Sequence, residues 1–126
     1  MLQRYFLPVG AATVWIALSE FLRNEVLLKT LWVEHYASLG LTFPDAPING
    51  AVWGLWSLGL AIVLCALLTR FSPVQAGALA WGAGFGLMWI VIGNMGVLPF
   101  GILPYAVPLS LLEVGLAVWI LRRLSR

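Results

Sequence analysis

Three long apolar stretches limit this chain to folds that live in a membrane. They are Ala51–Thr69, Ala76–Leu98 and Leu103–Leu121, the last interrupted by a single charge, Glu113. A helix rises 1.5 Å per residue, so about 19 residues reach roughly 28 Å, close to the ~30 Å hydrocarbon core of a bilayer. Only 10% of the 126 residues are charged and 62% are hydrophobic, which excludes a soluble globular domain and a disordered tail.

A fourth apolar segment, near the N-terminus, has two interpretations. Arg4, a run of about 14 apolar residues and the Ala17-Leu18-Ser19 triplet also fit a signal peptide cleaved before Glu20. Because the chain retains this segment, we interpret it as a first span of about residues 5–28. The prediction is an all-α integral membrane protein, a four-helix up-down-up-down bundle. It forms one transmembrane domain, 1–126, with the further spans at about 51–69, 76–98 and 103–121.

The distribution of basic residues predicts how this bundle is oriented. Five of the seven cations fall at one end of the predicted path and two, Arg23 and Lys29, at the other. The five are Arg4, Arg70, Arg122, Arg123 and Arg126. By the positive-inside rule we expect a multi-pass protein of the cell inner membrane with both termini in the cytoplasm. The connection from Lys29 to Gly50 is then a long first extracytoplasmic loop. Its start can continue as an interfacial helix, and its proline-rich end is extended.

Glu113 is the side chain that most needs an explanation. It lies near the middle of the last predicted span, about ten residues and roughly 15 Å from either end. An acidic side chain at that depth costs about 2.5 to 3.5 kcal/mol. Glu113 should therefore face the interior of the bundle, on the face that also carries Ser110 and Ala117.

We expect the other polar residues of the spans to gather around Glu113 beneath the long loop. The predicted ligand-binding cluster comprises Glu113, Glu20, Asn24, Asn94, Ser57 and Ser110. Arg23 is the one cation that could reach it. In a functional interpretation Glu113 binds a cation, a proton in transit or a polar ligand. In a structural interpretation Glu113 is protonated and ties helices together by hydrogen bonds of ~0.6 kcal/mol each. For Glu20, which lies closer to the surface, the structural interpretation is favoured.

Catalytic and cofactor signatures are absent from the sequence. There is no nucleophile elbow, no HExxH and no glycine-rich phosphate loop after a strand. His35 is the single histidine, and with Glu34 and Asp45 it makes a weak metal ligand set, so we expect neither metal nor cofactor. Seven scattered cations cannot form a nucleic-acid surface. The single Cys65 excludes a disulfide framework.

Two short stretches resemble known membrane families. Ala17-Leu18-Ser19-Glu20-Phe21-Leu22 is similar to the first helix of the small multidrug resistance transporters, and that resemblance implies a glutamate that couples drug and proton in a dimer. The chain departs from that family by its long first loop and its second carboxylate. The segment 44–53 resembles the proline-rich loop and following Val-Trp of the tryptophan-rich sensory proteins, which have five spans rather than four. We assign the chain to neither family.

Two functions from different classes remain open at this point. The first is a non-enzymatic protein that binds a small molecule or cation at the intramembrane carboxylate site, with or without transporting it, as a homo-oligomer in the lipid bilayer. The second is an accessory or structural subunit that docks on a larger membrane complex through small-residue faces such as Ala78, Gly82 and Gly86. A membrane enzyme using Glu113 and His35 is less favoured, since the two residues are expected at different depths.

Overall fold

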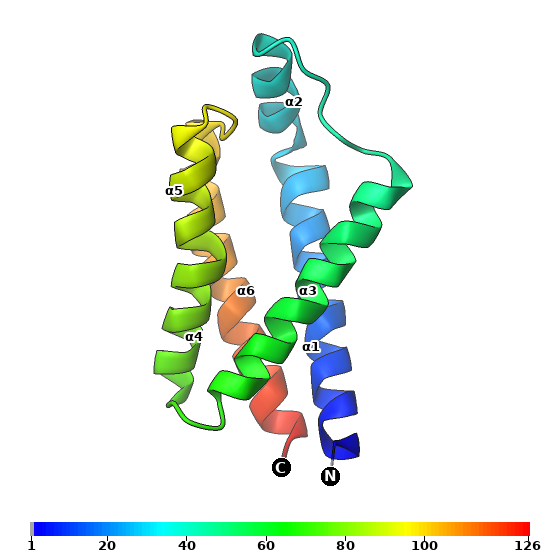
Figure 1. Ribbon diagram of the computed structural model, residues 1–126, viewed down its shortest axis with the longest axis vertical. Helices are drawn as coiled ribbons and strands as arrows, with labels where there is room; N and C mark the ends of the chain where they lie inside the picture. The colour runs from blue at the N-terminus through cyan, green and yellow to red at the C-terminus, as the bar shows by residue number, and fades with distance from the viewer. Residues whose placement is uncertain (1) are drawn as a thin grey trace.

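The computed structural model describes residues 2–126, and these are helical apart from short connections (Figure 1). In chain order the elements are α1 (Gln3–Phe21), the π-helix η1 (Leu22–Leu27), α2 (Lys29–Ser38), α3 (Pro47–Leu67), α4 (Pro73–Trp81), the π-helix η2 (Gly82–Gly86), α5 (Leu87–Asn94), the 3-10 turn η3 (Phe100–Ile102) and α6 (Leu103–Leu124). Four continuous helical stretches are long and apolar enough to cross a membrane: Gln3–Leu27, Pro47–Leu67, Pro73–Asn94 and Phe100–Leu124. The predictions of an all-α chain and of four membrane-length helices are confirmed, and the chain is a multi-pass membrane protein.

The helices are arranged around α1 and α6, which pack against each other. Helix α3 packs on α1, and α4 packs on α6. The two termini lie at one end of the molecule, whereas α2 and its connection to α3 lie at the other, here called the loop end (Figure 1). Helix α3 is inclined to the other helices in this view.

Two spans begin earlier in the chain than the hydropathy pattern indicates. Helix α3 begins at Pro47 rather than near residue 51, and α4 begins at Pro73 rather than near residue 76. Proline suits the first turn of a helix, because its missing N–H has no partner there and its φ is already helical. Ser72 and Gln75 form a reciprocal cap on α4. The Gln75 N–H donates to Oγ of Ser72 at 3.2 Å, and the Ser72 N–H donates to Oε1 of Gln75 at 3.1 Å. Pro47 and Pro73 thus start these helices and do not lengthen the connections before them.

The buried apolar residues form two separate groups. The larger group fills the half of the molecule nearer the termini and contains Ile16, Leu64 and Phe85. The smaller group lies beneath α2 and contains Leu28, Leu98, Ile102 and Ala106. The buried positions of the first span recur every three or four residues and so share one face: Pro8, Ala12, Ile16, Glu20 and Arg23. Along that face the apolar core therefore gives way to charge.

Candidate functional site

Three charged side chains are buried together between α1, η1 and α6. Glu20 is in the last turn of α1 and Arg23 is in η1, and each is 4% exposed. Glu113 is in the middle of α6 and is 0% exposed. The pairing of α1 with α6 brings a carboxylate from each helix to one guanidinium.

Arg23 bonds both carboxylates. Its Nη2 donates to Oε1 of Glu20, and its Nη1 donates to Oε1 of Glu113 at 3.3 Å. The guanidinium carbon also lies 5.3 Å from the centre of the Phe85 ring, which η2 supplies. One cation therefore faces two acidic groups, and Oε2 of Glu113 is buried without a hydrogen-bond partner among residues 2–126. A second positive charge, either a proton or a bound cation, would balance this layer.

A chain of hydrogen bonds leads from this layer towards α2. Asn24 Nδ2 donates to Oε2 of Glu20 at 3.1 Å and to the Glu20 carbonyl at 3.2 Å. Trp32 Nε1 donates to Oδ1 of Asn24 at 3.1 Å. On the side nearer the termini, Trp15 Nε1 donates to the Glu113 carbonyl at 2.9 Å. The Glu20 carboxylate is thereby linked to α2 through Asn24, whereas the Trp15 bond holds the backbone of α6 at Glu113.

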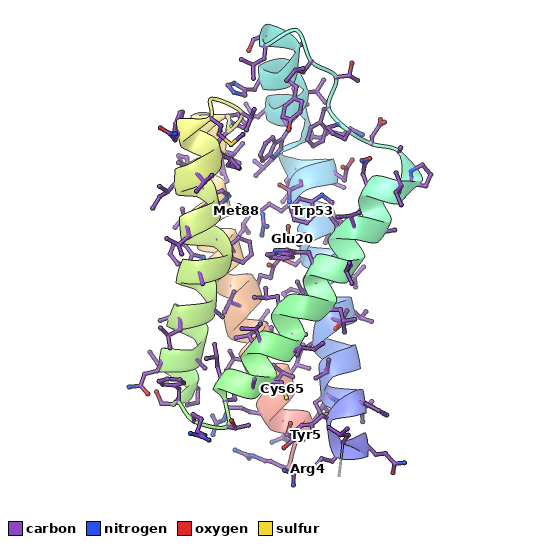
Figure 2. All side chains as sticks on the ribbon, viewed as in Figure 1. Arg4, Tyr5, Glu20, Trp53, Cys65 and Met88 are labelled. Atoms are coloured by element: carbon purple, nitrogen blue, oxygen red, sulfur yellow. The ribbon has the colours of Figure 1, made fainter. Side chains whose placement is uncertain are left out.

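A cavity of about 400 Å³ lies against the polar layer on its loop-end side. Glu20, Arg23 and Asn24 form its polar wall, and Glu25 lies beside them. The remaining wall is largely aromatic and aliphatic, and it includes Trp32, Tyr36, Phe43, Ile48, Val52, Trp53, Met88, Trp89, Ile92, Val97 and Ile102. Figure 2 shows Glu20, Trp53 and Met88 converging on the space between the helices. We refer to this space as the main cavity.

Aromatic side chains hold one another in place around the main cavity. Trp32 stacks on Phe43 with ring centres 5.7 Å apart, and Tyr36 meets Phe43 edge-on at 5.2 Å. These three rings come from α2 and the following loop. On the opposite side Phe85 contacts Trp89 at 5.5 Å. Such pairs contribute roughly 0.5–1.5 kcal/mol each beyond area burial, so these contacts stabilise the positions of the aromatic side chains.

A second cavity, of about 310 Å³, lies between the end of the first span and the start of α3. We call it the side cavity. It shares Glu20, Asn24, Glu25, Asn49 and Trp53 with the main cavity, so the two spaces adjoin. Its lining includes the carboxylates of Glu20, Glu25 and Asp45 and no basic residue.

Four of the five acidic residues of the chain thus belong to this region. Glu20, Glu25 and Asp45 line the cavities, and Glu113 binds Arg23 behind them. Lys29 forms an ion pair with Glu25 at 3.2 Å, and Arg23 forms ion pairs with Glu20 and Glu113. Four carboxylates face two cations here, which makes the region acidic although the chain carries a net charge of +2.

The structure divides the six residues expected to form the polar cluster into two sets. Glu20, Asn24 and Glu113 lie in one network around Arg23. The hydroxyls of Ser57 and Ser110 donate to carbonyls of their own helices, those of Trp53 and Val107, as serines inside helices often do. Ser110 also accepts a bond from Trp81 Nε1 at 2.8 Å. Asn94 is exposed at the end of α5.

The aromatic walls of the main cavity were not anticipated from sequence. Trp32, Tyr36 and Trp53 fit the interfacial belt of a membrane protein, and that pattern masks their convergence on one space. The sequence feature that points to this convergence is the clustering of aromatic residues on both sides of the Lys29–Gly50 connection. His35, the candidate metal ligand, bonds the Gly96 carbonyl at 2.8 Å. Among residues 2–126 no group of three or more His, Cys, Asp or Glu side chains could hold a metal ion.

Comparison of the chain with protein-family models, with curated proteins and with solved structures finds no match. The function is therefore argued from the geometry of the site.

Proposed function

We propose that this protein binds a small organic cation in the main cavity, with Glu20 and Glu113 supplying the charge that attracts it. The protein would act from the cell inner membrane as an up-down-up-down bundle. Five basic residues lie at the terminal end and two at the loop end, which supports a cytoplasmic location for both termini. The long Lys29–Gly50 connection would then face outwards.

The observation that carries the proposal is the unequal number of charges in a buried layer. Glu20 and Glu113 share one guanidinium, and one oxygen of Glu113 has no partner in the described chain. Burying an uncompensated charge is costly, so this layer favours a further positive charge, which a bound cation can supply. A ligand at the Glu20 side of the main cavity would supply that charge, and Arg23 could then be held more fully by Glu113.

The shape and walls of the main cavity support an organic ligand over a bare metal ion. Its volume of about 400 Å³ falls in the range of small-molecule sites, roughly 300–1,000 Å³, and its lining is mostly apolar with few polar groups. Aromatic rings attract organic cations with about 0.5 to 2 kcal/mol each, depending on desolvation. Trp32, Trp53 and Trp89 offer such rings beside the carboxylate of Glu20.

The test compares two probes of one shape that differ in charge. Benzyltrimethylammonium is a cation, and neopentylbenzene is its neutral carbon isostere. Binding to the purified protein in detergent is followed by tryptophan fluorescence, because three tryptophans line the main cavity. We expect saturable binding of the cation and none of the isostere, and about tenfold weaker binding in Glu20→Gln, equivalent to about 1.4 kcal/mol.

Glu34→Gln is the matched control. Glu34 is the one acidic residue outside the acidic region, it is exposed on α2, and its substitution changes the net charge by the same amount. Affinity in Glu34→Gln should equal that of the wild type. Equal binding of both probes, or equal losses in Glu20→Gln and Glu34→Gln, would contradict the proposal. Absence of any saturable binding, together with co-purification of a stoichiometric partner, would favour the accessory-subunit alternative.

A further inference from the structure

The side cavity gives the buried carboxylates a second approach, from between two helices. One of its sides is formed by the end of the first span, including Phe21, and the other by the start of α3, including Gly50 and Gly54. The side cavity adjoins the main cavity at Glu20 and Trp53, which line both. A ligand passing through it would reach the Glu20 carboxylate without crossing the aromatic residues of α2.

This approach lies at the loop end of the first two membrane-length helices, beside the connection that precedes α3. Its helical lining residues belong to the stretches Gln3–Leu27 and Pro47–Leu67, which are the first two membrane-length helices. Phe21, one of the residues that line it, is 58% exposed, as expected for a side chain that meets lipid. A Cβ built on Gly50 or Gly54 would meet no atom within 4 Å, so the α3 side of the passage is open space rather than a packed glycine contact.

The charge of the passage indicates what could use it. Glu20, Glu25 and Asp45 line it, and no basic side chain does. A polar head that moves along this wall should therefore be cationic, while its apolar part can remain among lipid chains outside Phe21. On its loop-end side the main cavity is instead lined by Trp32, Tyr36 and Phe43, which contact one another.

We infer that the side cavity is a lateral portal through which a membrane-dissolved cationic amphiphile enters the main cavity from the bilayer, between the end of the first span and the start of α3. This inference rests on the proposed function and narrows its ligand class to amphiphiles that partition into lipid. The cationic head reaches Glu20 past Gly54, and the apolar tail follows through the gap.

Gly54→Leu is the variant that tests the portal. The leucine has room at this position, and leucine favours a helix over glycine, so α3 should remain folded. Gly54 lines the side cavity but not the main cavity, so the ligand site itself is unchanged. Gly59→Leu is the control, since Gly59 lies on the same helix, also has no atom within 4 Å of its Cβ, and lines neither cavity.

The experiment measures rates with a probe that dissolves in the bilayer. The protein is placed in phosphatidylcholine nanodiscs, and trimethylammonium-diphenylhexatriene is added in a stopped-flow instrument while energy transfer from tryptophan is recorded. We expect Gly54→Leu to slow both association and dissociation by about tenfold, as a barrier raised by about 1.4 kcal/mol would. Gly59→Leu should match the wild type, and the affinity for benzyltrimethylammonium in detergent should be equal in all three proteins.

Each result has a distinct meaning. Unchanged rates in Gly54→Leu, with benzyltrimethylammonium still bound by the wild type, would overturn the portal alone. Equal slowing in Gly54→Leu and Gly59→Leu would also overturn it, because the effect would then not depend on the gap. If the wild type binds neither cation, the proposed function fails and the portal fails with it.

Discussion

Arg23 is the residue on which the buried polar layer depends. Among residues 2–126 it is the one guanidinium that contacts Glu20 and Glu113, and all three side chains are almost completely removed from solvent. Isolated carboxylates in such surroundings are far more costly than neutral amides of the same shape. The three residues therefore differ sharply in what their replacement should do.

Arg23→Gln should lower the free energy of unfolding by about 3–5 kcal/mol, because it leaves two buried carboxylates without a cation. Glu113→Gln should have a much smaller effect, since the pair of Arg23 with Glu20 survives and the amide removes an acid that had one unpartnered oxygen. Unfolding by denaturant in mild detergent, followed by circular dichroism, measures both. Equal stability of the two variants would show that the guanidinium does not balance this layer.

At the scale of elements, the two π-helices adjust the register of the helices that build the site. Segment η1 carries Arg23 and Asn24, and η2 carries Phe85, which packs against the Arg23 guanidinium. A π-turn holds extra backbone per turn and rotates the side chains that follow it. Without η1 the residues after Arg23 would follow a regular 3.6-residue repeat and point elsewhere.

Only those parts of the site that depend on the order of residues along the chain could be predicted from the sequence. Glu20 and Glu113 were identified because a charge within an apolar run is visible in one dimension, and Asn24 follows Glu20 by one helical turn. The aromatic walls are not predictable in this way, because Trp32, Tyr36 and Trp53 also fit the interfacial belt of a membrane protein. The sequence predicts Ser57 and Ser110 in the polar cluster because a polar side chain in a span needs a partner. The helix's own backbone already supplies that partner.

Helix α2 is attached to the rest of the molecule in part by one side chain. A ring nitrogen of His35 bonds the carbonyl of Gly96, which has a φ of 79° in the turn after α5. His35→Ala should lower the free energy of local opening of α2 by about 1 kcal/mol. This corresponds to roughly fivefold faster amide hydrogen exchange over residues 29–38. Exchange within α3 should not change. Glu34→Ala, at the neighbouring exposed position, is the control, and equal acceleration in both variants would show that helix propensity and not the bond is responsible.

At the scale of the whole molecule, charge is separated between the two ends. The termini lie together at one end, with Arg4 labelled there in Figure 2, while the acidic cavities lie towards the loop end. The number of spans was predictable because run length is a property of the sequence alone. The inclination of α3 depends on packing between distant residues and has no such signature.

The charge separation predicts which end faces the cytoplasm, and this can be measured with single cysteines. In a Cys65→Ser background, Thr42→Cys places a thiol in the connection between α2 and α3, and Ser125→Cys places one just after α6. Both positions are exposed. The positive-inside rule predicts that a membrane-impermeant maleimide added to cells with an intact inner membrane labels Thr42→Cys and spares Ser125→Cys. After the membrane is permeabilised, both thiols should react, which controls for intrinsic reactivity. The opposite pattern in intact cells would place the acidic cavities on the cytoplasmic side, and the cation would then be taken from the cell interior.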